Sequence, residues 1–190
     1  AEIEPTGVIS DTTPLVSIRF FENTVIDEAD LSGMTNPYHL PNLTTLLSYD
    51  GYAHTYQLTT QQSLIEGEYK ITVKARRVLG ADDYGAQGEF IETFKVDQTP
   101  PIIVAITNPA HSHRLPVTVN ARTNEPSMCK YSFYDLSYDD LEFTSTAPGF
   151  ASEHVFQIYE IAAISTKIYV KCKDMADNKM LSPKIVDVSV

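Results

Sequence analysis

Acidic and amide side chains in two predicted turns and one proline-rich joint are the residues best suited to bind an ion. Asp97 lies in the joint, whose sequence is VDQTPP. Glu125 lies in one turn, and the other turn, DMADN, carries Asp174, Asp177 and Asn178. Calcium takes about six to eight oxygen ligands from carboxylates, amides and carbonyls. These residues are a candidate calcium site, and the alternative is that the aspartates only hydrogen-bond their own turns.

Two further groups of side chains in the second half of the chain have the chemistry to bind a ligand. The first is an aromatic group that could form a platform for sugars, made up of Tyr131, Tyr134, Tyr138 and Phe143. The chain has no tryptophan, and about half of this group is expected in the core. The second is an acidic loop that could hold a cation, with carboxylates at Asp135, Asp139, Asp140 and Glu142. A solvated acidic loop is the commoner outcome.

Catalytic motifs are absent from the sequence. It contains no nucleophile elbow, no glycine-rich phosphate loop and no H-E-x-x-H zinc motif. His111 and His113 could face one side of a strand as a metal pair, but no cysteine or third histidine lies near them to complete a zinc site. We expect a protein that is not an enzyme and that needs no cofactor, with calcium as the one candidate ion.

The charge and hydropathy of the chain exclude several partners. The net charge is −11, from 14 basic and 25 acidic residues. Nucleic acids and anionic membranes attract clustered lysine and arginine, so we expect neither as a partner. No apolar run approaches the roughly 18 residues of a transmembrane helix, and no signal peptide is visible at Ala1. We expect either a mature chain or a part of a longer one.

Two cysteines, Cys129 and Cys172, both fall in the second half of the chain. Cys129 alternates in phase with Tyr131 and Phe133, and Cys172 alternates in phase with apolar residues of another predicted strand. Both thiols therefore point to an apolar face. A pair of cysteines in one domain indicates a disulfide and an oxidising compartment, and two buried free thiols are the alternative.

Pro100 and Pro101 divide the chain near its middle. Proline has no backbone N–H and fixes its own φ, so this pair cannot lie inside a helix or a central strand. An alternating strand runs into the joint and the apolar run at residues 102–106 leaves it. We expect two domains of similar size, residues 1–97 and residues 98–190, connected by a short and stiff extended segment.

In the first half, apolar and polar residues alternate as they do in half-buried strands. Residues 2–9 are predicted as a single strand and residues 15–21 as the next. Residues 25–34 are predicted as a helical turn capped by Asp27. Residues 80–88 are rich in glycine and aspartate, which predicts a loop.

In the second half, the same pattern gives about seven short strands. Strands at residues 117–122 and 128–134 are predicted on either side of a loop at 124–126. Residues 135–150 are polar, acidic and irregular. Tyr169 falls on the outward parity of its strand, together with the lysines around it.

One tyrosine in the first half has a special setting. Leu64, Gly67 and Tyr69 form the pattern L-x-x-G-x-Y at the start of a strongly alternating strand. This is the pattern of a tyrosine corner, in which the ring enters the core and the hydroxyl bonds to the preceding loop, and an ordinary strand tyrosine is the alternative. Separately, Asn42 opens an N-x-T glycosylation sequon, a triplet that also arises by chance.

Five motifs follow one another along residues 1–101: I-x-P-T-G, T-x-P-x-V-x-I-x-F, D-x-x-x-L-S-G, L-x-x-G-x-Y-x-I-x-V and F-x-V-D-x-T-P-P. In this order they resemble the Ig-like modules of bacterial and archaeal surface-layer proteins and large adhesins. In the second half, D-x-A-D-N resembles the turn D-x-A-G-N before the last strand of many tandem Ig-like modules. The resemblance implies seven-stranded sandwiches, usually in tandem and usually without catalysis.

The strand order of that fold places the candidate site residues. The third and sixth strands are neighbours in one sheet, so we predict a Cys129–Cys172 disulfide within that sheet. The second-to-third and sixth-to-seventh loops lie at the end where the chain enters the domain. Glu125 and Asp174 should therefore lie at the same end of the second domain, where Asp97 arrives in the joint.

These expectations define a fold class and a function. We predict an all-β chain of two tandem Ig-like, fibronectin-III-like Greek-key sandwiches. It should serve as a non-catalytic structural, adhesion or spacer module of a prokaryotic surface protein, outside the cell. The expected partners are neighbouring domains of a longer surface protein, with another protein or a glycan left open. Two alternatives remain: an ancillary, carbohydrate-binding region of a secreted enzyme, and a filament subunit.

Overall fold

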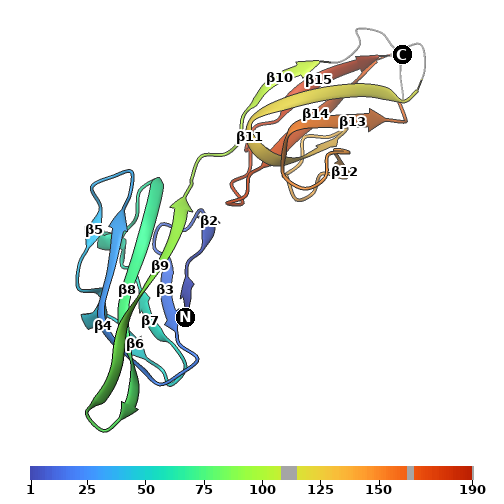
Figure 1. The fold of residues 1–190 in the computed structure, drawn as a ribbon. Coiled ribbons are helices and arrows are strands. Elements are labelled where there is room, and N and C mark those ends of the chain that lie inside the picture. The colour runs from blue at the N-terminus through green and yellow to red at the C-terminus, as the bar shows by residue number, and fades with distance from the viewer. Residues whose placement is uncertain (108–114, 162–164, 190) are drawn as a thin grey trace. The chain divides into compact units, whose positions relative to one another are not determined.

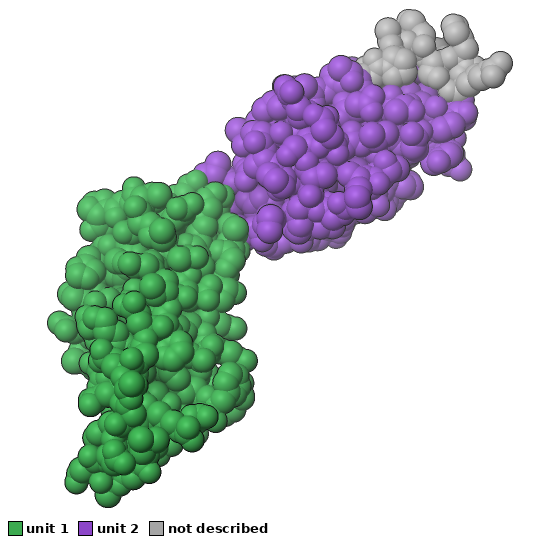
Figure 2. All heavy atoms as spheres, in the orientation of Figure 1, with its two compact units in different colours: residues 1–98 green, residues 99–190 purple. Residues whose placement is uncertain are grey.

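The computed structural model describes residues 1–107, 115–161 and 165–189, and nearly all their regular structure is β-strand (Figure 1). The chain divides into two compact units, unit 1 (Ala1–Gln98) and unit 2 (Thr99–Val190) (Figure 2). This division falls one residue after the boundary expected from the sequence. His111 and His113 lie outside the described residues. In the described ranges, no helix is long and apolar enough to cross a membrane.

Unit 1 is a sandwich of two sheets. One sheet has the strand order β1 (Glu2–Glu4), β3 (Leu15–Arg19), β7 (His54–Gln57), β6 (Ser48–Tyr49). The other has the order β2 (Gly7–Ile9), β9 (Asp83–Val96), β8 (Gly67–Gly80), β4 (Thr24–Gly33), β5 (His39–Leu40). Two short 3-10 turns complete the unit, η1 (Leu43–Thr45) and η2 (Thr60–Gln62). The paired strands of this unit run antiparallel, except β2 and β9, which run parallel.

The core of unit 1 follows from alternation along its strands. On β8, Tyr69, Ile71 and Val73 are fully buried, and the lysine and threonine residues between them lie toward the outer face. Val16 and Ile18 enter the same core from β3 in the facing sheet. Each such side chain contributes roughly 1.5–3 kcal/mol when it is fully buried, so this core is the main source of stability of the unit.

The helical turn predicted at residues 25–34 is wrong, because this segment is strand β4. The pairing of β4 with β8 shifts between Ile26 and Glu28, which makes Asp27 the extra residue of a β-bulge. Its carboxylate accepts hydrogen bonds from Arg76 on β8, at 3.0 and 2.9 Å from Nε and at 2.6 Å from Nη2. Arg76 lowers the pKa of Asp27. Asp27 thus stabilises a strand irregularity rather than a helix start.

Two other predicted boundaries in unit 1 are also wrong. Residues 2–9 form two strands in two different sheets, β1 and β2, and Pro5 lies at the break because it cannot donate to a sheet. Residues 80–88 are not a loop, since β8 and β9 continue as a hairpin to a tight turn at Ala81 and Asp82. Asp82 has φ of +57°, a conformation that aspartate tolerates better than most residues.

Unit 2 is a second sandwich in which one long strand, β11 (Val117–Ser132), takes part in both sheets. Its N-terminal half pairs with β10 (Ile103–Thr107) and β13 (Ala151–Ile158). Its C-terminal half pairs with β12 (Phe143–Thr144) and β14 (Ser165–Lys173), and β15 (Lys184–Ser189) pairs with β14. Buried side chains of both sheets form one core, which includes Val119, Phe156, Ile168, Cys172 and Val186.

The loop predicted at residues 124–126 lies inside β11, so that prediction is wrong. The pairing of β11 with β13 shifts between Arg122 and Ser127, and the strand passes from one sheet to the other in this interval. Pro126 lies within the shifted part, where its missing N–H removes no ladder hydrogen bond. The turn-forming residues therefore mark a change of sheet rather than the end of a strand.

Both units have the strand order of Ig-like Greek-key sandwiches. In unit 1 the connections β3–β4, β5–β6 and β7–β8 each cross from one sheet to the other. In unit 2 the sheet β10-β11-β13 faces the sheet β12-β11-β14-β15, as in fibronectin-III-like sandwiches. The predicted fold class, all-β with two tandem Ig-like sandwiches, is confirmed.

Within each unit the chain enters at one end and leaves at the opposite end. In unit 1, Glu2 pairs with Arg19 beside the β3–β4 turn, whereas β9 ends at Val96, next to Ile9, at the other end. In unit 2, Ile103 pairs with Thr123 at the end where β11 changes sheets. Strand β15 runs from there to its last pairing, between Ser189 and Ser165, at the far end of the unit.

Candidate functional site

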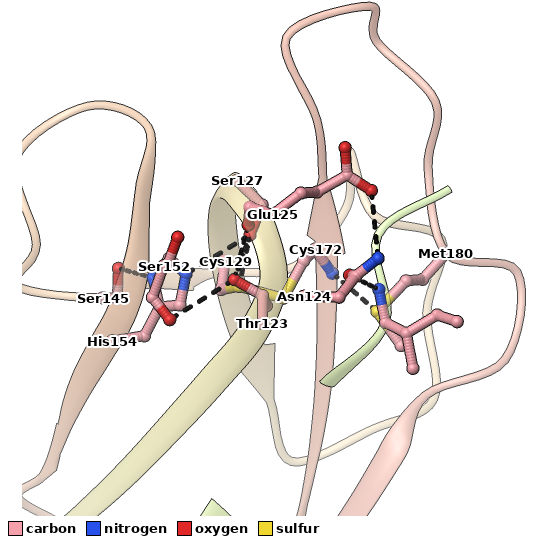
Figure 3. Close-up of a disulfide and its surroundings, with 11 residues drawn as sticks. Thr123, Asn124, Glu125, Ser127, Cys129, Ser145, Ser152, His154, Cys172 and Met180 are labelled. Carbon is pink, nitrogen blue, oxygen red and sulfur yellow. Dashed lines mark hydrogen bonds between the residues drawn. A yellow bond between two sulfur atoms is a disulfide. The ribbon is translucent and has the colours of Figure 1, made fainter. Parts of the chain in front are cut away.

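Cys129 on β11 and Cys172 on β14 form a disulfide (Figure 3). The two residues are direct partners in the antiparallel pairing of these strands, and their Cα atoms are 4.1 Å apart. Both are buried in the core of unit 2. The predicted disulfide is therefore present, between neighbouring strands of one sheet, and it joins residues 43 positions apart in the sequence.

A buried group of polar side chains lies beside the disulfide (Figure 3). His154 on β13 is only 1% exposed, with Nε2 3.3 Å from Oγ of Ser127 and Nδ1 3.3 Å from Oγ of Ser145. The Ser127 hydroxyl donates to Oγ1 of Thr123 at 3.1 Å and lies 3.7 Å from Sγ of Cys129. Burial lowers the pKa of His154, so the neutral ring is favoured in the folded state.

Ser127 and His154 have the residue types of a nucleophile and its base, but their setting is structural. Ser127 is fully buried, so no substrate atom can reach its hydroxyl. The second ring nitrogen of His154 faces Ser145 rather than a carboxylate that could orient the ring. In the part of the chain that the structure describes, this pair satisfies buried polar atoms and offers no catalytic geometry.

Tyr69 has the geometry of a tyrosine corner. Its hydroxyl donates to the carbonyl of Ile65 at 2.8 Å and accepts the N–H of the same residue at 3.0 Å. Gly67 has φ of +149°, and a Cβ at this position would lie 2.7 Å from Nδ2 of Asn36, so only glycine fits. Leu64 is buried in the core. The three residues thus tie the start of β8 to the segment before it.

The candidate calcium ligands of unit 2 lie near the end where β10 begins, and their carboxylates interact with neighbouring protein groups. Asp174 is 3% exposed, and its carboxylate accepts the backbone N–H of Asn178 at 2.9 Å and the side-chain amide of Asn178 at 2.8 Å. Asp177 forms ion pairs with Lys173 at 2.7 Å and Lys179 at 3.2 Å, and these lysines lower its pKa. Asp177 is therefore neutralised without a metal.

Glu125 brings a second carboxylate to Asp174. One carboxylate oxygen of each lies within 4.8 Å of the other, and both side chains belong to unit 2. Asp97 belongs to unit 1, where its N–H donates to the carbonyl of Ile9 at 2.8 Å and its Oδ2 accepts from Nζ of Lys95 at 2.6 Å. Calcium binding at the predicted set of Asp97, Glu125, Asp174, Asp177 and Asn178 stays a prediction, and Glu125 and Asp174 are the two carboxylates that lie close together within unit 2.

The acidic loop after β11 pairs its carboxylates with nearby donors. Asp135 lies 3.0 Å from Nζ of Lys171, and Asp139 lies 3.0 Å from Nζ of Lys179. Asp140 accepts a hydrogen bond from a serine hydroxyl of the same loop at 2.6 Å. Lys171 is only 5% exposed, although its parity predicted an outward position, because Nζ is bonded to this loop. These partners favour a structural role for the loop over cation binding.

The aromatic group predicted as a sugar platform does not form one. Tyr131 and Tyr138 are each 4% exposed, whereas Tyr134 is 69% exposed. Burial raises the pKa of Tyr138 to about 12, and Nζ of Lys130 lies 4.9 Å from the centre of its ring. Two of the four rings belong to the interior and offer no free face to a sugar. The physical reason is that Tyr131 points into the core from β11, whereas Tyr138, in the loop after that strand, is covered by the packing of the loop.

An open groove of about 480 Å³ lies instead between β12 and β13 on one flank of unit 2. Six of its lining residues make the groove aromatic and acidic: Tyr131, Phe133, Glu142, Phe143, Tyr159 and Glu160. The sequence singled out three of them, and the shared parity of Tyr131 and Phe133 pointed to a fourth. Nothing in the sequence marks Tyr159 or Glu160, because only the packing of the two sheets brings the end of β13 near β12.

Asn42 lies on the surface at the start of η1. It is exposed, has φ of +57°, and donates its backbone N–H to the carboxylate of Asp30 at 3.0 Å. An exposed turn suits an acceptor asparagine, since a glycan is bulky and needs solvent around it. Glycosylation at Asn42 stays a prediction.

The chain was compared with known proteins at three levels. No family model matches it, and no curated protein matches it. Among solved structures, a chimeric titin Z1Z2 functionalized with a KLER peptide from decorin is similar, with 14% identity and a TM-score of 0.31, over 98% of this chain and 91% of that one. The titin domains Z1Z2 in complex with telethonin share 13% identity, with a TM-score of 0.26 and the same coverage. Likenesses this distant carry no argument, so the fold class rests on the strand order described above.

Proposed function

We propose that this chain is a non-catalytic structural and spacer module of a cell-surface protein, in which two Ig-like sandwiches are joined in series. The observation that carries the proposal is the path of the chain, which crosses each unit from one end to the other. Tension applied to the chain before and after a unit would therefore act on the strand pairing within that unit. Neighbouring domains of a longer protein are the natural partners of such a module.

Unit 1 resists tension through the parallel pairing of β2 and β9. Gly7, Val8 and Ile9 on β2 are in register with Phe94, Lys95 and Val96 on β9. The chain leads into β2 from one end of the unit and out of β9 at the other. A pulling force therefore slides the two strands in opposite directions, and their hydrogen bonds are loaded together in shear rather than one after another.

Unit 2 resists extension in a different way. Its terminal strands, β10 and β15, each pair with an inner strand, and no pairing between the two occurs among the described residues. The Cys129–Cys172 disulfide instead encloses the middle of the unit. Under tension the loop between these cysteines, which are 43 positions apart, stays closed, so only the flanking segments can lengthen.

The disulfide also supports a location outside the reducing cytosol. Disulfides persist in oxidising compartments, such as the cell surface, and are rare in cytosolic proteins. Protein isolated from its source, denatured and treated with an alkylating reagent before any reductant, should show no alkylated cysteine by mass spectrometry. Two alkylated thiols in the denatured, unreduced protein would contradict a surface location.

Single-molecule force spectroscopy on the full chain tests the proposal. Unit 1 should lengthen by roughly 300 Å when it unfolds, at about 3.3–3.6 Å per residue. Unit 2 should lengthen by only roughly 150 Å, since the loop between its cysteines cannot open. With a reductant, the step from unit 2 should grow to roughly 300 Å, while the step from unit 1 stays the same.

The variant C129S/C172S is the matched control, because it should give the long step from unit 2 without any reductant. Unfolding of both units at forces no higher than those that extend an unfolded chain would contradict a role in resisting tension. If the step from unit 2 stays short both with the reductant and in the double variant, the disulfide is not what limits the extension of this unit.

A further inference from the structure

The groove between β12 and β13 exists because the two sheets of unit 2 are left open on one flank. β12 is the edge strand of one sheet and β13 is the edge strand of the other, and each pairs with a different half of β11. Tyr131, which is buried on β11, and the half-buried Phe133 just after it therefore lie at the base of the opening between the two edges. The result is a groove of about 480 Å³ with side chains of the core at its floor.

The floor of the groove is aromatic and is held in a fixed position. Tyr131 stacks on Phe143 with ring centroids 4.9 Å apart, and Phe133 meets Phe143 edge-on at 5.9 Å. The Tyr131 hydroxyl donates to the carbonyl of Gln157 at 3.1 Å, which links the floor to β13. Phe143 is 39% exposed and Tyr159 is 67% exposed, so both rings offer a face to solvent.

Two carboxylates flank these rings. Glu142 precedes β12 and Glu160 follows β13 by two positions, so they approach the groove from different sheets. Both side chains are exposed, and neither makes an ion pair within the described ranges. Among the residues that the structure describes, no lysine or arginine lines the groove. Since the chain also carries a net charge of −11, the groove presents negative charge beside apolar surface.

We propose that this groove binds an arginine side chain presented by an extended, basic segment of a partner protein. A guanidinium group is planar and stacks on aromatic faces such as those of Phe143 and Tyr159. Its forked N–H donors can reach carboxylates on two sides, here Glu142 and Glu160. The negative charge of the groove disfavours nucleic acid and acidic peptides. This binding role goes beyond the spacer function, because a spacer needs no occupied groove.

The experiment is a titration of the isotopically labelled full chain with the blocked peptide acetyl-Gly-Arg-Gly-Arg-Gly-amide, followed by amide chemical shifts. Shift changes should concentrate on the residues of β12, the end of β13 and the C-terminal half of β11. Binding should weaken at least tenfold between low salt and about 0.5 M salt, because short-range screening removes the charge attraction. The same peptide with lysine should bind more weakly, and the peptide with glutamate should not bind.

Three variants locate the site. E142Q/E160Q keeps the shape of the groove and removes its charge, and we expect at least tenfold weaker binding. Y159A removes a ring that is 67% exposed, so the fold should be unaffected while binding weakens severalfold. E153Q is the matched control, since Glu153 is an exposed glutamate of β13 that does not line the groove, and binding should be unchanged.

Several outcomes would overturn the proposal. The first is that no amide chemical shift of the groove residues changes at several millimolar peptide. The second is that the glutamate peptide binds as tightly as the arginine peptide. The third is that E153Q and E142Q/E160Q weaken binding equally. Tighter binding of a neutral oligosaccharide than of the arginine peptide would assign the groove to sugars. Sedimentation of the chain alone gives the last test, because a dimer that E142Q/E160Q converts to monomer would assign the groove to a second copy.

Discussion

Unit 1 ties the core of its sandwich to a loop through one tyrosine, whereas unit 2 joins two strands of its core by a disulfide. Tyr69 on β8 bonds both backbone groups of Ile65 through its hydroxyl. Cys172 on β14, the strand in the corresponding place of unit 2, is bonded to Cys129 on β11. The hydroxyl restrains a few residues, while the disulfide restrains the loop between two residues 43 positions apart even when the unit is unfolded.

The difference shows how one strand order can be stabilised by unlike chemistry. Unit 1 has a parallel pairing between its terminal strands, β2 and β9, and unit 2 has none among its described residues. Unit 2 has a buried cluster of histidine and serine beside its disulfide. The hydroxyl of Tyr131 on β11 also donates a hydrogen bond to a backbone carbonyl of β13. Each unit should therefore lose stability when its own feature is removed.

The largest effect should come from the disulfide. C129S/C172S should lower the free energy of unfolding of unit 2 by about 4 kcal/mol, since the bond restricts the unfolded chain over a long loop. The melting transition of unit 1 should not move. Differential scanning calorimetry of the full chain, with and without reductant, measures both. A shift shared equally by the two transitions would mean that the units do not unfold independently.

The hydroxyl of Tyr69 should have the next largest effect. Tyr69→Phe leaves the backbone groups of Ile65 without their partner, so unit 1 should lose about 1–3 kcal/mol. Tyr169→Phe is the control in unit 2, where this half-buried ring should contribute less than about 0.5 kcal/mol through its hydroxyl. Urea unfolding monitored by amide signals from each unit gives both values. Equal losses of unfolding free energy in the two variants would show that the hydrogen bonds of the tyrosine corner add no stability beyond that of an ordinary tyrosine hydroxyl.

Acidification should destabilise unit 2 through His154. Burial lowers the pKa of this histidine below its usual 6.5, so below that pH the unfolded state binds a proton that the folded state resists. The stabilisation is complete above about pH 6.5 and declines as the pH falls toward the lowered pKa. Neighbouring Glu153 opposes this shift, as its charge raises the pKa. The melting temperature of unit 2 measured from pH 7.5 to 5.5 should fall, and H154Q should flatten that dependence even if it lowers overall stability.

The smallest effect should come from calcium. We propose weak binding at Glu125 and Asp174, whose oxygens lie within 4.8 Å of each other. With a dissociation constant of about 1 mM, as in extracellular calcium modules, 5 mM calcium would stabilise unit 2 by about 1 kcal/mol. Calorimetric titration and melting curves measure this in chelator-treated protein. E125Q and D174N should abolish the shift, D140N in the acidic loop should not, and no heat with no shift would end the proposal.

Local sequence patterns were sufficient where a residue acts through its own strand. Alternation on β8 and β3 placed their core residues, and the setting of Tyr69 in L-x-x-G-x-Y pointed to the corner geometry that the structure has. The inward parities of Cys129 and Cys172, taken with the strand order, gave the right sulfur pair. In each case the side chain alternates with period two, and the strand order does the rest.

Sequence patterns failed where the chain breaks local rules for a tertiary reason. Asp27 resembles a helix cap, but β4 pairs with β8 and uses the aspartate in a bulge against Arg76. Glycine and aspartate at residues 80–88 indicate a loop, yet pairing across the β8–β9 hairpin makes strands of most of them. Local propensity for turns is weaker than the hydrogen bonds that a neighbouring strand supplies.

The sequence by itself determined the fold class, the division into two units, and the two side-chain links that close their cores. Periodicity, proline placement and cysteine parity are local properties of the chain, and the resemblance to tandem Ig-like modules supplied the strand order that paired the two cysteines. Only the tertiary structure decided that β11 passes between sheets, that Tyr138 is buried, and that Glu142 and Glu160 flank one aromatic groove. Those facts depend on which edges of the two sheets meet, and edge placement is set by packing of the whole unit rather than by any segment of it.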